Sequence, residues 1–156
     1  MMFSYRLVRL IETHADKLAS GLEKKVLSSG YVTCYRIIPN HELRERVYEV
    51  YRHLGDWLLG KNQAEIENRY REIGARRALQ GVPLAELIQA IILTKENLWD
   101  FLKSEAVVDR AVEILGELEL LRMLDQFFDR AIYFAAVGYQ EKVEQLKRQE
   151  QEVLAG

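Results

Sequence analysis

The chain has 156 residues, which is enough for one domain with a substantial core, and its formal net charge is −2. This slight excess of acids argues against a nucleic-acid partner, because proteins that follow phosphates carry an excess of Lys and Arg. A single cysteine, Cys34, excludes an internal disulfide framework and a metal site built from several thiolates. Charges interrupt the N-terminal segment, and no apolar run is long enough to span a bilayer. We therefore expect a cytoplasmic protein without membrane insertion.

The segment before Gly30 carries apolar side chains at three- and four-residue spacing, which predicts one helix. Its apolar stripe is formed by Leu7, Ile11, Leu18 and Leu22. Residues 31–39 have no helical period, so we expect an ordered, mostly extended connection there. Asn40 is predicted to cap a second helix, which Gly60 ends.

A third helix is predicted to open at Asn62 and to stop before Gly81, which suits the left-handed position after a helix. Pro83 suits the first turn of a fourth helix that ends near Leu102, because a first-turn N–H has no partner within the helix. The Gly-Val-Pro stretch is therefore expected to fold the chain back on itself. Gly74 lies beside the inward stripe of the third helix and would let another helix approach closely.

A long fifth helical pattern starts near Val107, and after Gly138 its composition turns to Gln, Glu, Lys and Arg. Residues in this last part still follow alternating three- and four-residue steps, as in a short coiled-coil seam: Ala136, Tyr139, Val143, Leu146, Glu150 and Val153. The pattern is typical either of a frayed, solvated helix end or of a stalk that pairs or leads to an output domain. We expect an all-α bundle of five principal helices, with a helical sensory domain at 1–138 and a projecting C-terminal stalk or tail at 139–156.

Three charged residues fall on helix faces that are otherwise apolar: Arg77, Lys95 and Asp125. A lone buried charge costs several kcal/mol, so such groups find partners or reach solvent. We expect Lys95 or Arg77 to meet Asp125, or Asp129, inside or at the rim of the bundle. This set predicts either a structural ion network or a polar pocket for a small anionic or polar ligand. An alternative anion site is the start of the fourth helix, near Arg76 and Arg77.

Histidines offer little support for a metal or haem site. His14 continues the stripe of the first helix and His53 flanks that of the second, and a haem-binding alternative would use one of them. No H-x-x-x-H, E-x-x-H or C-x-x-C spacing is present. We expect no metal, no cofactor and, because no general acid, base or nucleophile motif is found, no enzyme.

Two stretches, RYREIGARRALQGVPLAELIQAIILTKENLWDFL and FFDRAIYFAAVGYQEKVEQL, resemble the N-terminal sensory domain of the RsbRD-type RsbT co-antagonists. That domain is also found at the front of bacterial sensor histidine kinases. The similarity lies in residues 62–142 and rests on the Arg-rich helix, the Q-G-V-P-L turn, the L-W-x-F-L helix end and the aromatic segment before G-Y. It implies a helical domain that senses or transmits a signal to a C-terminal output module. The sequence contains no such module, so we expect a stand-alone relative or a fragment cut at the stalk.

We therefore predict a non-catalytic bacterial signal-transduction domain that relays a signal through helix packing to an output module or partner protein. We also expect a homodimer, and Leu93, on the polar side of the fourth helix, hints at a contact beyond the monomer. A small ligand would bind near Arg77, Lys95 and Asp125. Two alternatives stay open, a globin-like sensor that binds haem or another cofactor and a dimerisation module without a ligand.

Overall fold

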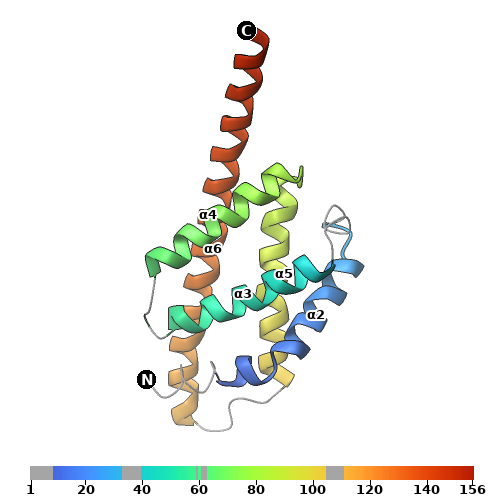
Figure 1. The fold of residues 1–156 in the computed structure, drawn as a ribbon. Helices are drawn as coiled ribbons and strands as arrows, with labels where there is room; N and C mark the ends of the chain where they lie inside the picture. The colour runs from blue at the N-terminus through green and yellow to red at the C-terminus, as the bar shows by residue number, and fades with distance from the viewer. Residues whose placement is uncertain (1–8, 33–39, 59, 61–62, 105–110) are drawn as a thin grey trace.

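The computed structural model of the chain describes residues 9–32, 40–58, 60, 63–104 and 111–156. It is an all-α bundle with a long projecting C-terminal helix, as predicted (Figure 1). The principal helices are α2 (Ala15–Ser28), α3 (Asn40–Leu58), α4 (Gln63–Leu79), α5 (Leu84–Ser104) and α6 (Ala111–Ala155). Within this described part, no helix combines the length and the apolar character that a membrane span requires.

The prediction of a single helix before Gly30 is wrong, because the chain bends at His14 and forms two helical segments. Residues 9–13 are helical, His14 has φ −112° and ψ 23°, and α2 starts at the next residue. Nδ1 of His14 lies 3.0 Å from the carbonyl oxygen of Leu10, the same oxygen that accepts from the backbone N–H of His14. Such side-chain contacts with the backbone are known to bend helices. Residues 33–39 of the connection predicted at 31–39, and the helix start predicted near Val107, lie outside the described residues.

The helices pack in two crossing layers. Figure 1 shows α3 and α4 crossing in front of α5 and α6, while α2 lies beside α5. The most extensive contact between two helices in the described part is that of α4 with α6, and α2 packs on both α5 and α3. Helix α4 therefore packs on α6 on one side of the bundle, and α2 packs on α5 on the other.

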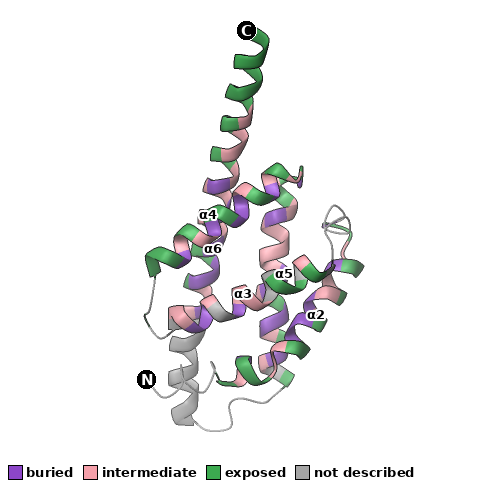
Figure 2. Cartoon of the chain, viewed as in Figure 1, coloured by how far each residue is buried: buried purple, intermediate pink, exposed green. Residues whose placement is uncertain are grey.

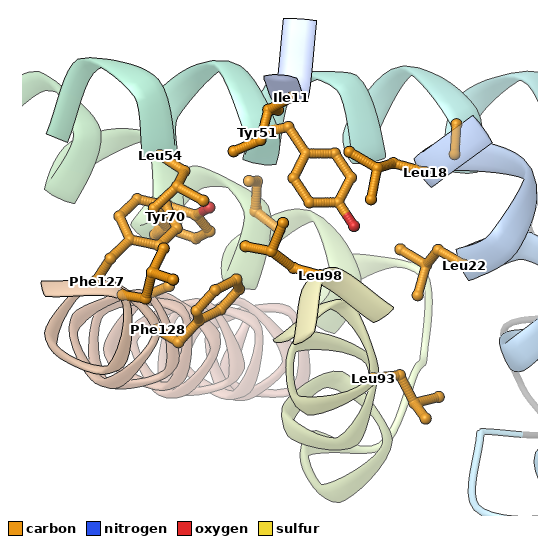
Figure 3. Close-up of a cluster of buried hydrophobic side chains, with 14 of the residues drawn as sticks. Ile11, Leu18, Leu22, Tyr51, Leu54, Tyr70, Leu93, Leu98, Phe127 and Phe128 are labelled. Atoms are coloured by element: carbon orange, nitrogen blue, oxygen red, sulfur yellow. The ribbon is translucent and has the colours of Figure 1, made fainter. Parts of the chain in front are cut away.

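One hydrophobic core joins all five principal helices (Figure 3). Its centre is aromatic. Tyr70 of α4 and Phe127 of α6 pack edge to face with ring centroids 5.9 Å apart, and the ring centroids of Phe127 and Phe128 are 5.2 Å apart. Leu93, for which a contact beyond the monomer was predicted, belongs to this core and is only 8% exposed. The prediction was wrong because α2 covers the side of α5 that the sequence pattern assigned to solvent.

The turn between α4 and α5 has the geometry that the sequence predicts. Gly81 has φ 77°. Its backbone N–H donates a hydrogen bond to the carbonyl oxygen of Ala78 at 3.1 Å, and the N–H of Val82 donates one to the carbonyl oxygen of Arg77 at 3.0 Å. These two bonds form a Schellman motif, which needs a residue that adopts positive φ without strain. The Pro83 carbonyl then accepts the first helical bond of α5 from Leu87 at 3.2 Å. The stretch folds the chain back, and this is its structural role.

Two glycines allow α4 and α6 to touch backbone to backbone. A Cβ added to Gly74 would overlap the carbonyl oxygen of Ala135, and one added to Gly138 would overlap that of Arg71. The obstacle is backbone in both cases, so no side chain can swing aside. The close approach predicted for Gly74 is confirmed, and Gly138 is its counterpart on α6. We call this contact the glycine crossing.

The glycine crossing predicts a large difference between two Gly→Ala substitutions. Gly138→Ala should lower the free energy of unfolding by at least about 2 kcal/mol, because α4 and α6 must separate to admit the methyl group. Gly30→Ala is the control, since a Cβ at Gly30 meets nothing within 4 Å and its φ is not positive. Urea unfolding followed by circular dichroism measures both. Equal, small effects would show that the two helices do not meet at these residues.

Candidate functional site

The base of the projecting part of α6 is tied to the turn between α4 and α5. The hydroxyl of Tyr139 donates a hydrogen bond to the carbonyl oxygen of Val82, at 2.5 Å, and Val82 is fully buried. The preceding residue, Gly138, lies in the glycine crossing. Helix α6 is thus held at two successive residues where residues 139–156, the predicted stalk, begin.

Four polar side chains gather where α3 begins and α4 ends, and we call them the Glu42 cluster: Glu42, Arg76, Arg77 and Gln80. Oε1 of Glu42 accepts hydrogen bonds from Nε of Arg76 at 2.6 Å, Nε2 of Gln80 at 3.2 Å and Nη1 of Arg77 at 3.3 Å. Nη1 of Arg77 also donates to Oε1 of Gln80, at 2.7 Å. The cluster joins the start of one helix to the end of the next.

Charge compensation stabilises the Glu42 cluster. Arg77 is only 2% exposed, so its guanidinium needs the carboxylate of Glu42 close by. The hydrogen bond from Arg76, helped by one from Gln80, lowers the pKa of Glu42 from 4.5 to about 2, although burial acts in the opposite direction. The acid lies in the first turn of α3 and both arginines lie in the last turn of α4, where helix dipoles favour these signs.

Lys95 of α5 and Asp125 of α6 form a second charged pair. Nζ of Lys95 lies 3.0 Å from Oδ1 of Asp125, and the two side chains are 33% and 49% exposed. The same oxygen has no partner of good hydrogen-bond geometry, so charge rather than a directed hydrogen bond joins the two groups. The pair lies at the rim of the bundle and is one of the alternatives that the sequence predicted, in which Lys95 or Arg77 meets Asp125 or Asp129.

The three predicted site residues therefore lie in two places. Arg77 belongs to the Glu42 cluster, next to the turn that precedes α5. Lys95 lies about three turns, or about 16 Å, along α5 from the start of that helix. The structure brings Lys95 and Asp125 together and places Arg77 at the other end of α5. A ligand pocket shared by all three residues has no geometric support.

Asn97 is a buried polar residue that the sequence pattern placed on the solvent side of α5. It is 6% exposed, and its Nδ2 donates to the carbonyl oxygen of Leu18 at 2.8 Å and to the hydroxyl of Tyr51 at 3.0 Å. Burial raises the pKa of Tyr51 to about 12, so its hydroxyl stays protonated. Asn97 thus joins α2, α3 and α5. Only knowledge that α2 packs on this side of α5 would have revealed this role.

The two histidines of the haem alternative contact different aromatic rings. His14 packs against Phe101, with ring centroids 5.3 Å apart, and His53 packs edge-on against Tyr70 at 6.1 Å. Among the residues that the structure describes, no group of three or more His, Cys, Asp or Glu side chains could hold a metal ion.

Helices α5 and α6 run antiparallel. Val82, just before α5, bonds Tyr139, whereas Lys95, further along α5, pairs with the earlier residue Asp125 of α6. Moving forward along one helix therefore means moving backward along the other.

An apolar face lies on this helix pair, outside the hydrophobic core. Ile88, Ile92 and Trp99 of α5 are half-buried, and their spacing places them on one side of the helix. Ile132 of α6 lies level with Ile88 in the antiparallel pair, and its neighbour Tyr133 is 62% exposed. None of these side chains is part of the core cluster. We call these five residues the α5–α6 face.

The stripe of α6 that faces α5 continues into the stalk. Steps of seven residues from Asp125, which contacts α5, lead to Ile132, Tyr139, Leu146 and Val153. Figure 2 shows that the stalk is largely exposed, and Val153 is 79% exposed. The stripe thus lies beside α5 within the bundle, and beyond Tyr139, which bonds Val82, no described helix lies against it.

Comparisons with known proteins find one matching family and one similar fold. Residues 30–154 match the family model described as the RsbT co-antagonist protein rsbRD N-terminal domain. The crystal structure of the sporulation inhibitor pXO2-61 from Bacillus anthracis is similar, with a TM-score of 0.69 and 23% sequence identity over 87% of this chain and 96% of that one. At this identity the likeness concerns the fold. A search of curated proteins finds no match.

The Glu42 cluster predicts an acid-sensitive contribution to stability. Because the pKa of Glu42 is lower in the folded protein, its contribution is present above pH 4.5 and is lost as pH falls towards 2. The difference between these pKa values corresponds to about 3 kcal/mol, so Glu42→Gln should destabilise the protein by about that amount at neutral pH and by less in acid. Urea unfolding across this pH range measures the effect. Glu45→Gln, an exposed change in the same helix, is the control and should have little effect at any pH.

The Lys95–Asp125 pair should contribute little to stability, because solvent screens both side chains. A double-mutant cycle with Lys95→Met and Asp125→Asn is expected to give a coupling energy of about 1 kcal/mol or less. Thermal unfolding of the four proteins measures this energy. A coupling above about 2 kcal/mol would contradict the exposed position of the pair.

Proposed function

Because the chain belongs to the family of RsbT co-antagonist protein rsbRD N-terminal domains, we propose that it is a non-catalytic bacterial signal-transduction domain. It relays a signal through helix packing to an output module or partner protein, which the stalk engages. The carrying observation is that α6 runs as one helix from the core to the tip of the stalk. A displacement of α6 inside the bundle therefore moves the stalk as well.

The relay point in this proposal is the glycine crossing. No side chain lies between the backbones of α4 and α6 at Gly74 and Gly138, so a shift of α4 acts directly on α6. The mechanism needs two helix arrangements close in free energy and a ligand or partner that favours one of them. Arg77, Lys95 and Asp125 are the proposed polar elements of this switch. Arg77 ties α4 to α3, and the half-exposed Lys95–Asp125 pair ties α5 to α6 where a polar ligand can compete for either charge.

We propose that the domain works as a homodimer, paired in parallel along α6. The part of the stripe that includes Leu146 and Val153 has no covering helix among the described residues, whereas its earlier part lies beside α5. The α5–α6 face continues this apolar surface onto the bundle. A second copy of the chain offers the same two surfaces, and a two-fold pair buries both at once.

Leu146→Asp tests this proposal, because it places two new charges in the paired seam. The dissociation constant of the dimer should rise by at least about twofold, because the stalks no longer contribute to pairing. Arg148→Gln, which makes the same change of net charge on the outer side of the stalk, should leave dimerisation unchanged. Sedimentation velocity measures the subunit state, and native mass spectrometry also reports any retained small molecule or haem.

Two results would contradict the proposal. A wild-type protein that stays monomeric at all concentrations would exclude the dimer, and equal effects of the two substitutions would exclude the stalk seam as its interface. Haem or another cofactor retained in the mass spectrum would favour the globin-like sensor instead.

A further inference from the structure

A parallel pair of stalks would bring like charges together, and we propose that this repulsion keeps the paired stalk marginal, so that the stalks of a dimer can join or separate. The inference rests on the proposed function and adds how the pairing is controlled. It concerns the last two helical repeats of α6, in which charged residues occupy positions at and beside the seam.

Glu150 occupies a seam position. The seam residues Tyr139, Val143, Leu146 and Val153 are apolar, and Glu150 follows Val143 by seven residues in the same helix. In a parallel pair, a residue at this position packs against the same residue of the second copy. Two carboxylates would therefore meet at the symmetry axis, where neither can be solvated as it is in the single chain.

The flanks of the seam carry a second conflict. Lys142 precedes Leu146 by four residues, and Lys147 follows it by one. These positions lie on opposite edges of the seam. In a parallel pair, residues at this separation face each other across the interface, and opposite charges there stabilise the pair. Here lysine would face lysine, twice for each dimer.

Two further charged residues of the stalk pair with each other and do not relieve this repulsion. Glu144 and Arg148 lie on the outer side of the stalk and pair with each other within the helix, at 3.7 Å. Lys142 donates to Gln145 of its own helix, at 3.2 Å, and that neutral partner supplies no negative charge. The last two repeats of the stalk thus combine three apolar seam layers, at Val143, Leu146 and Val153, with three unfavourable charge contacts in each dimer. This combination gives the two arrangements of similar free energy that a relay needs.

Disulfide cross-linking at the stalk tip tests the inference on the full chain. Val153→Cys in a Cys34→Ser background places one thiol in the seam, and the rate of diamide-induced disulfide formation reports how often the tips are together. Glu150→Leu should raise this rate by about tenfold, and Glu150→Gln should raise it as well, because both remove the repulsion. Glu152→Leu, the same change on the outer side of the stalk, is the matched control. At about 1 M NaCl, where the Debye length is about 3 Å, the wild-type rate should rise towards that of Glu150→Leu.

The outcomes separate this inference from the proposed function. A dimer whose cross-linking rate is the same after Glu150→Leu and Glu152→Leu would overturn the charge control alone and leave the dimer in place. A rate that rises with Glu150→Leu but not with Glu150→Gln or salt would also overturn it, because packing would then be the cause. A monomer that never cross-links in any variant would overturn both proposals.

Discussion

Backbone contact between α4 and α6 constrains the rest of the domain. At Gly74 and Gly138 the helices meet without side chains between them, and any larger residue at either position would push them apart. The aromatic centre of the core, with Tyr70 on α4 and Phe127 on α6, forms on one side of this contact. On the other side α6 leaves the bundle, and Tyr139 is fixed to the turn at Val82. The direction of the stalk is therefore set inside the core.

Polar contacts fix the register that apolar packing leaves open. Hydrophobic burial is not directional, so the core alone would let helices slide or rotate. The Glu42 cluster aligns the start of α3 with the end of α4, and Asn97 aligns α5 with α2 and α3. Breaking such a contact leaves a buried polar group without a partner, which costs more than the contact contributes. These polar contacts therefore fix the positions of the helices relative to one another.

Much of this architecture follows from local sequence rules. Gly81 and Pro83 mark the turn, Gly74 marks a close approach, and the position of Lys95 on an apolar helix face predicts that it meets an acid. The match over residues 30–154 confirms the predicted resemblance to the RsbRD-type domain. The relation to sensor histidine kinases and the boundary at residue 138 stay predictions.

Other features depend on which helices meet, and local patterns do not contain that information. The buried role of Asn97 and the burial of Leu93 follow from α2 lying over α5. The partner of Arg77 is Glu42, on another helix and far away in the sequence. The bend at His14 arises from a side-chain contact with the backbone, which hydrophobic periodicity does not register.

The central claim is that the glycine crossing fixes the stalk rigidly to α4. Electron–electron resonance distances between spin labels test it directly, with one label at Glu72→Cys on α4 and one at Gln149→Cys on the stalk, in a Cys34→Ser background and diluted with unlabelled protein. A label pair within α6, at Glu141→Cys and Gln149→Cys, supplies the width expected for a rigid element. The account predicts that the distance distribution between α4 and the stalk is as narrow as the one within α6. A much broader distribution between α4 and the stalk would contradict it, because the stalk would then move independently of the bundle.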